Sequence, residues 1–337
     1  MNSKKLRIGI IGCGKIAQIR HIPEYLLNEG VEVVAVSDVN YKRAKEVATN
    51  NDIPFYFQNY RELLNMPDID AVSVCTPNAT HAEVTIQALY NQKHVLVEKP
   101  IAINIEDAEK MVNLAQTKNK ILMVGYNQRL SPIHNWVKSY IKHEGIGKVY
   151  QFQSNFQHGG PGNWSIDGKN SWFFDRKEAG FGVTVDLGVH KLDLLQWLIN
   201  DEIYQAQSFL SFNDKASVED NAVFIVKTKS GILGTFSFSW NNPQQDHRTV
   251  IYGEKGRIIL GESYHGAIVE LNSGEVIEKE LNPQLRPDGF LNSGVVDDFV
   301  QCVRTGRRAT ASGLEALKTM KILLDQVNGL WIKELGE

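Results

Sequence analysis

Residues 6–17 read LRIGIIGCGKIA, an apolar run that ends in a glycine-rich turn. The turn follows the pattern G-x-G-x-x-A, with Gly12, Gly14 and Ala17 at its three small positions. Gly12 permits a tight turn, Gly14 lets a pyrophosphate approach bare backbone, and Ala17 lets the next helix pack closely on the strand. The N-terminus of that helix offers free N–H groups to phosphate. The stretch predicts a strand, a turn and a helix that bind a dinucleotide, with Lys15 and Ile16 as further cofactor contacts.

An acidic residue follows the second apolar run of the chain, at residues 31–36. Asp38 lies 24 residues after Gly14, which is close to the ~20-residue spacing of the acid that hydrogen-bonds an adenosine ribose. As an alternative, Asp38 is a solvated loop acid or caps the helix that begins near Asn40. A carboxylate here repels a 2′-phosphate and favours NAD, while the nearby Lys42 and Arg43 leave NADP open.

The bulk composition excludes several classes of protein. The chain has 337 residues, 42% of them hydrophobic, a formal net charge of −3 and a pI near 6.3. This charge gives no basic footprint for nucleic acid, and no apolar stretch approaches the ~18 residues of a membrane span. The three cysteines, Cys13, Cys75 and Cys302, are widely spaced and predict neither a disulfide framework nor a zinc site. We expect a cytoplasmic protein that needs no metal.

Hydrophobic periodicity divides the chain into two domains. In residues 1–124, continuous apolar strands alternate with helical patterns, which predicts a doubly wound parallel sheet of the Rossmann type. In residues 125–337, strand candidates joined by short polar turns predict an α+β domain with an open, mostly antiparallel sheet. The predicted strands of the first domain are 8–11, 31–36, 71–74, 94–97 and 121–124, and those of the second are 149–156, 206–212, 222–228, 232–240, 249–252 and 257–260.

Two strand ends of the first domain carry polar residues where ligands bind in such folds. The strand at 71–74 is followed by Thr76, Pro77, Asn78 and His81, and the strand at 94–97 by Glu98, Lys99 and Pro100. Proline disfavours helix for the residue before it, so Lys99 is extended and places an amine at the cofactor crevice. The alternative is an ordinary solvated loop lysine.

A second cluster of ionisable residues begins a helix in the other domain. Asp186 and His190 are four residues apart, which places them on one face if the helix has begun. A helix N-terminus disfavours imidazolium, so His190 is suited to accept a proton. The alternative is that Asp186 caps the helix and His190 is a satisfied buried residue.

A long irregular segment, residues 158–176, is rich in Gly, Asn and Trp. Long loops of this kind are often functional. Trp172 either stacks on a sugar or nicotinamide or packs the loop onto its own domain. Trp172 and Arg129 are the substrate-contact candidates.

Taken together, these motifs resemble the glucose–fructose oxidoreductase/inositol dehydrogenase/MocA (Gfo/Idh/MocA) family over nearly the whole chain. The glycine turn, Thr76-Pro77-Asn78 with His81, Glu98-Lys99-Pro100 and Asp186-x-Gly188-x-His190 occur in the family's order. The resemblance implies an NAD(P)-binding Rossmann domain, residues 1–124, and a C-terminal domain, residues 125–337, that binds substrate and forms homodimers or homotetramers through its sheet. It also implies that Lys99, Asp186 and His190 line the catalytic site, and that the proline after Lys99 is often cis.

The resulting hypothesis is reversible hydride transfer between NAD(H) and a secondary alcohol of a cyclic polyol, sugar or nucleotide sugar. His190 accepts the hydroxyl proton, Asp186 orients it, and Lys99 stabilises the alkoxide. Two alternatives stay open. One is a glycoside-cleaving enzyme that keeps NAD tightly bound, and the other is a non-catalytic NAD-sensing regulator.

Overall fold

The computed structural model describes residues 4–143, 145–213, 217–261 and 265–334. The chain forms two compact units, one comprising residues 1–127 and 284–317 and the other residues 128–283 and 318–337. The first unit thus extends to residue 127 where a division at residue 124 is predicted, and it includes a second segment. Residues 284–317 lie late in the chain but pack with the first unit.

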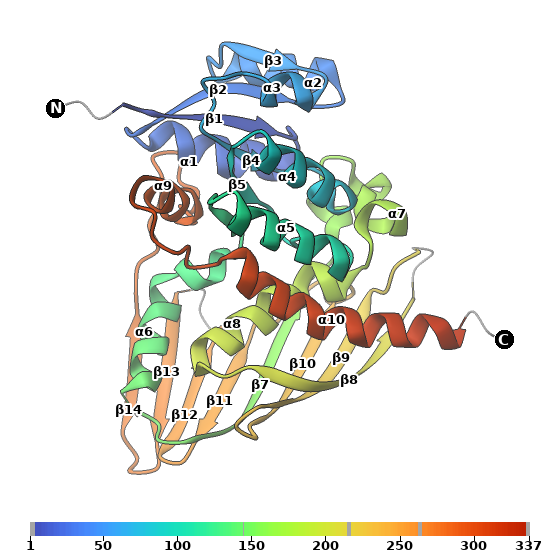
Figure 1. The fold of residues 1–337 in the computed structure, drawn as a ribbon. Coiled ribbons are helices and arrows are strands. Elements are labelled where there is room, and N and C mark those ends of the chain that lie inside the picture. The colour runs from blue at the N-terminus through green and yellow to red at the C-terminus, as the bar shows by residue number, and fades with distance from the viewer. Residues whose placement is uncertain (1–3, 144, 214–216, 262–264, 335–337) are drawn as a thin grey trace. The chain divides into compact units, whose positions relative to one another are not determined.

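A six-stranded parallel sheet forms the centre of the first unit, in the order β3-β2-β1-β4-β5-β6 (Figure 1). The Rossmann-type prediction is confirmed. The strands are β1 (Leu6–Ile11), β2 (Val31–Ser37), β3 (Phe55–Phe57), β4 (Ala71–Val74), β5 (His94–Val97) and β6 (Leu122–Val124). The helices are α1 (Ile22–Leu27), α2 (Tyr41–Asn50), α3 (Tyr60–Leu64), α4 (His81–Tyr90), α5 (Ile105–Thr117) and α9 (Val295–Thr305).

The continuous apolar runs are buried because helices cover the sheet, as expected for parallel strands. Every residue of β4 is buried, and so are the last three of β5. Asparagine side chains begin several helices: Asn40 accepts the N–H of Arg43 at the start of α2, and Asn104 accepts that of Asp107 at the start of α5.

Residues 284–317 join the first unit through backbone and side-chain contacts. The N–H of Val124 donates to the carbonyl of Ala311, and Arg304 of α9 donates to the carbonyl of Gly30. Because these contacts join segments far apart in the chain, no local pattern predicts them.

The second unit contains an eight-stranded sheet in the order β14-β13-β12-β11-β7-β10-β9-β8, with helices α6 and α8 against one face (Figure 1). All neighbours pair antiparallel except β7 and β10, which confirms the mostly antiparallel prediction. The strands are β7 (Val149–Gln157), β8 (Ile203–Ser211), β9 (Asn221–Thr228), β10 (Leu233–Ser239), β11 (Thr249–Gly253), β12 (Gly256–Leu260), β13 (Gly266–Leu271) and β14 (Val276–Glu280).

The helices of the second unit are α6 (Pro132–Lys142), α7 (Arg176–Ala179) and α8 (Val189–Ile199), and α10 (Gly313–Glu334) contributes its residues from Lys318 onward. Among the helices that lie within the described ranges, none is both long and apolar enough to cross a bilayer.

Three strands were not predicted. β3 has only three residues, and β14 ends in three consecutive charged residues on an edge, where pairing rather than burial stabilises the strand. β13 lies between β12 and β14 and forms hydrogen bonds with both strands.

Candidate functional site

The glycine turn after β1 has the geometry of a phosphate cradle. Gly12 has φ +92°, and a Cβ on this residue would lie 2.5 Å from the carbonyl oxygen of Cys75, so only glycine fits. By contrast, apart from its chain neighbours and the adjoining helix backbone, no atom of the described residues lies within 4 Å of a Cβ built on Gly14. The backbone is therefore open where a pyrophosphate has to approach. Lys15 is exposed and Ile16 is half-buried beside this opening.

Asp38 ties the end of β2 to the glycine turn. Its Oδ2 accepts the backbone N–H of Cys13 at 2.9 Å, and its Oδ1 accepts that of Asn40 at 2.8 Å. Arg43 Nη1 lies 3.6 Å from Oδ2. The side chain that caps α2 is that of Asn40, so the alternative of Asp38 as the helix cap does not hold. A carboxylate has about four acceptor positions, which leaves capacity for a ribose hydroxyl.

The ends of β4 and β5 are joined by a buried histidine. His81 is 1% exposed, with Nδ1 2.7 Å from the carbonyl oxygen of Pro100 and Nε2 2.9 Å from that of Thr76. Burial lowers the pKa of His81, and a neutral ring donates to one of these two oxygens. His81 therefore holds the loops after both strands together. The predicted cis peptide is present between Lys99 and Pro100.

Other predicted cofactor contacts lie at the same strand ends. Asn78 is 5% exposed and begins the turn into α4 after Pro77. The hydroxyl of Thr76 is buried and makes no hydrogen bond to any part of the chain that the structure describes. An unsatisfied buried hydroxyl and an open glycine backbone both fit a polar cofactor bound along this edge of the sheet.

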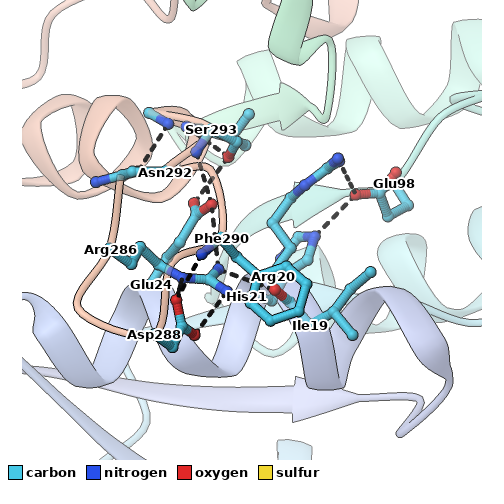
Figure 2. A network of polar contacts seen from close by, with 12 residues as sticks. Ile19, Arg20, His21, Glu24, Glu98, Arg286, Asp288, Phe290, Asn292 and Ser293 are labelled. Atoms are coloured by element: carbon cyan, nitrogen blue, oxygen red, sulfur yellow. Dashed lines mark hydrogen bonds and ion pairs between the residues drawn. The ribbon is translucent and has the colours of Figure 1, made fainter. Parts of the chain in front are cut away.

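Glu98 is buried and faces away from solvent, next to the half-buried Lys99. Its Oε2 accepts the backbone N–H of Lys99 at 3.2 Å, and its Oε1 lies 2.8 Å from His21 Nε2 (Figure 2). Burial by itself raises the pKa of Glu98, but the hydrogen bond and charge of His21, with Arg20 and Lys99, lower it to about 2. Glu98 is therefore a carboxylate. No local sequence pattern indicates its partner His21, which is 77 residues away.

In the second unit, the predicted catalytic pair begins a helix through a π-helical turn. Asp186 lies in the π-helix η7 (Thr184–Gly188), and His190 lies in the first turn of α8. Such turns are rare and frequently occur at functional sites. Asp186 is 5% exposed and its Oδ2 accepts the indole N–H of Trp240 at 3.1 Å, whereas His190 is half-buried. The pair therefore does not follow regular α-helical spacing.

A buried glutamate accepts hydrogen bonds from the first residues of this π-helical turn. Glu219 is fully buried, its Oε1 accepts the N–H of Thr184 at 3.1 Å, and its carbonyl accepts that of Val183 at 2.9 Å. A Cβ on Gly182 would lie 1.9 Å from the same carbonyl oxygen. Burial raises the pKa of Glu219. Glu219 is not among the residues predicted from the sequence, because nothing in its sequence neighbourhood indicates contact with the Asp186 motif.

His190 belongs to a group of imidazoles around one phenylalanine. The ring of Phe156, on β7, lies 6.0 Å from His190, 6.0 Å from His158 and 4.9 Å from His247, measured between ring centroids. Lys191 is buried beneath this group and its Nζ donates to the carbonyl of His247 at 2.9 Å. Burial lowers the pKa of Lys191 to about 8. An aromatic surface ringed by hydrogen-bonding groups is a common lining of small-molecule sites.

The two substrate-contact candidates lie in different surroundings. Arg129 is 4% exposed and its Nε and Nη2 each donate to Asp193 at 2.7 Å. Trp172 is half-buried and stacks on Phe173, with ring centroids 3.9 Å apart. Phe173 also packs edge-on against Trp164. Contact of Arg129 or Trp172 with substrate stays a prediction.

Two family models match the chain. The model described as an oxidoreductase family with an NAD-binding Rossmann fold matches residues 6–126, and the GFO/IDH/MocA C-terminal domain matches residues 134–259.

Characterised relatives cover most of the chain at low identity. A 1,5-anhydro-D-fructose reductase from Ensifer adhaerens is 31% identical over 255 residues, which is 75% of either chain. A scyllo-inositol 2-dehydrogenase (NAD(+)) from Bacillus subtilis is 24% identical over 96% of this chain and 94% of its own. Among solved structures, a levoglucosan dehydrogenase with NADH and levoglucosan has a TM-score of 0.87 and 21% identity, covering 96% of both chains.

Proposed function

Because the chain belongs to the Gfo/Idh/MocA family of oxidoreductases, we propose that it transfers a hydride reversibly between NAD(H) and a secondary alcohol of a cyclic polyol, sugar or nucleotide sugar. The observation that carries the proposal is the Asp186–His190 motif, in which a buried carboxylate held by Trp240 precedes a half-buried imidazole at the start of α8. This is a site for moving a proton.

The residues of the first unit hold the cofactor. The open backbone at Gly14 takes the pyrophosphate, Asp38 takes the adenosine ribose, and the strand-end residues Thr76 to Asn78 lie along the rest of the cofactor. When bound, NAD supplies the hydride acceptor for alcohol oxidation. Lys15, Ile16, His81 and Glu98 complete the set of residues assigned to the cofactor site.

Three residues of this chain act on the substrate alcohol. His190 takes the hydroxyl proton during oxidation and returns it during reduction, because an imidazole titrates near neutral pH. Asp186 orients the ring and stabilises its charged form. Lys99 donates a hydrogen bond to the alkoxide as it develops. No step in this scheme requires a metal.

The substrate class is supported by what the relatives are named for. The Ensifer protein is a 1,5-anhydro-D-fructose reductase and the Bacillus protein a scyllo-inositol dehydrogenase. Both names specify cyclic compounds with several hydroxyl groups. The imidazoles around Phe156 suit such a substrate, because they offer hydrogen-bonding groups beside an apolar ring.

The test is NADH formation by the purified protein with NAD or NADP and a panel of inositols, aldoses, glycosides and nucleotide sugars. We expect turnover with NAD that Lys99→Met and His190→Ala lower by about 10²–10⁴-fold, with NAD affinity nearly unchanged. Full activity in the Lys99→Met, His190→Ala double variant refutes the assigned roles. Glycoside cleavage without net NADH supports the tightly bound NAD alternative, and NAD binding without any chemistry supports the sensor.

A second copy of the chain covers the open face of the eight-stranded sheet. Large apolar side chains project from this face with more than two fifths of their surface exposed: Phe209, Val223, Ile225 and Leu233. They come from the neighbouring strands β8, β9 and β10, so they form one patch. Phe209→Glu is expected to shift the mass measured by light scattering toward the monomer. An unchanged mass contradicts this interface.

A reducing compartment such as the cytoplasm suits the thiols, since Cys13, Cys75 and Cys302 are all free and buried.

A further inference from the structure

A buried histidine that no motif singles out touches the segment containing Lys99. We propose that His21 is a positioning residue: through Glu98 it fixes the backbone of Lys99 and so sets where the lysine amine lies. The inference rests on the proposed function, in which Lys99 contacts the substrate oxygen.

His21 is the middle of a chain of buried hydrogen bonds. Its Nε2 lies 2.8 Å from Glu98 Oε1, and its Nδ1 lies 3.2 Å from Ser73 Oγ, which in turn lies 2.8 Å from the hydroxyl of Tyr25. His21, Ser73 and Tyr25 are fully buried. Because a carboxylate only accepts, the contact to Glu98 orients His21 with Nε2 as donor. This series of hydrogen bonds therefore fixes the orientation of the Glu98 carboxylate.

The Glu98 carboxylate passes this orientation to Lys99. One of its oxygens accepts from His21 and the other accepts the Lys99 N–H. The space around it is closed, because a Cβ on Gly125 would lie 3.0 Å from Glu98 Oε1. On the far side of Lys99, the carbonyl of Pro100 contacts His81. Lys99 thus lies between two buried imidazoles: His21 acts on the N–H of Lys99 through Glu98, and His81 contacts the carbonyl of the next residue, Pro100.

The helix that carries His21 begins next to the glycine turn. His21 ends the π-helix η1 (Ala17–His21), in which the N–H of Ile22 donates to the carbonyl of Ala17. This wider turn buries His21 together with Ala17 and Ile22. Since η1 follows directly on the glycine turn, one short helix contacts both the predicted pyrophosphate site and the Lys99 segment.

A late segment of the chain clamps the outer side of the same helix (Figure 2). Arg286 is 4% exposed and donates to the carbonyl of Ile19 at 2.8 Å and to Asp288. Glu24 accepts both the N–H and the hydroxyl of Ser293 at 2.7 Å. These contacts limit movement of η1 and α1, as a positioning role for His21 requires.

A bland alternative is that His21 and Glu98 form a buried pair that only adds stability. In that case, removal of His21 lowers the free energy of unfolding but leaves the lysine amine of the folded protein unchanged. If His21 positions Lys99, its removal changes the amine in the folded protein and lowers kcat more than it changes KM for NAD. The two cases therefore differ in measurements on folded protein.

The experiment compares His21→Leu with His21→Gln and with a matched control, His94→Asn. Gln carries an amide N–H that can replace the Nε2 donor. His94 is a histidine at the opposite end of β5 from Lys99, and it contacts the N–H of Ile121. Each folded protein is treated with N-hydroxysuccinimidyl acetate, and the rate of Lys99 acetylation is followed by mass spectrometry. This readout needs no substrate, so it stands if the proposed reaction fails.

We expect several-fold faster acetylation of Lys99 in His21→Leu and a fall in kcat of about 100-fold, with KM for NAD within about twofold of wild type. In His21→Gln, the acetylation rate and kcat return most of the way to the wild-type values, and His94→Asn changes neither quantity. Wild-type acetylation in His21→Leu overturns the inference, and so does an equal change in His94→Asn. If His21→Leu does not fold, Ser73→Ala is used, and its failure to change acetylation overturns the inference too. By contrast, undiminished turnover in Lys99→Met refutes the proposed role of Lys99 in the reaction.

Discussion

The buried pair of Arg129 and Asp193 gives the sharpest test of a prediction made from the sequence. The sequence predicts that Arg129 contacts substrate, but its guanidinium makes two hydrogen bonds of 2.7 Å to Asp193, and the two side chains are 5% and 2% exposed. Arg129→Met removes both bonds and leaves a buried carboxylate short of its partner. Breaking a buried pair in this way costs about 3–5 kcal/mol of unfolding free energy.

This magnitude agrees with the hydrogen bonds taken singly. Each bond to a charged group contributes about 1.5–3 kcal/mol, and Asp193 loses two. In the double variant Arg129→Met, Asp193→Leu, no charge is left buried, so most of the loss is recovered. A matched control is Arg257→Met, which removes an exposed arginine paired with Glu270 in the same unit. We expect that change to stay within about 0.5 kcal/mol.

The assay is urea unfolding followed by tryptophan fluorescence, with KM for the substrate measured on the same proteins. A loss below about 1 kcal/mol in Arg129→Met, or a loss equal to that of Arg257→Met, refutes the structural role. If stability is kept while KM rises, Arg129 contacts substrate as the sequence suggested.

Three further predictions concern single titratable groups. Asp38→Ala is expected to raise the KM for NAD about tenfold. The KM for NADP should change less, because Arg43 loses its counter-charge and is left to pair with the 2′-phosphate. An equal rise of KM for both cofactors contradicts this. Burial lowers the pKa of Lys191 from 10.5 to about 8, so between these pH values the unfolded chain holds a proton that the folded chain lacks. The stability of wild type should therefore rise with pH across this window, by about 3 kcal/mol relative to Lys191→Met. If the urea midpoints of the two proteins change equally with pH, this prediction is wrong. Burial, with the charge of Lys120, lowers the pKa of His94 from 6.5 to about 4. Wild type should accordingly lose stability as pH falls through this range, and His94→Asn should lose less when melting temperatures are compared.

Much of the fold follows from patterns that are local in the sequence. Three features act on residues next to them in the chain: the apolar run before Gly12, the asparagine at the start of α2 and the proline after Lys99. Their effects can therefore be predicted from the sequence. Alternation of strands and helices over residues 1–124 indicates a parallel sheet because its connections have to cross over. Short polar turns in residues 125–337 indicate antiparallel pairing, because a short turn can join only antiparallel neighbours.

Local patterns fail where the stabilising partner is distant in sequence. The edge strand β14 has little apolar character and exists because β13 pairs with it. Residues 284–317 return to the first unit through contacts such as Arg286 to Ile19, which are separated by 267 residues. Neither hydrophobic period nor helix capping carries such information.

The phosphate cradle, the Lys99 loop and the Asp186–His190 motif can be predicted from the sequence alone, because the chemistry of each depends on residues a few positions apart. The residues that hold these motifs in place become visible only in the folded chain. The fold brings Ser73 to His21 and His21 to Glu98, Glu219 to the turn that contains Asp186, and Asp193 to Arg129. The physical reason is that a buried charge or polar group must find a partner wherever the fold offers one, and packing of distant segments selects that partner.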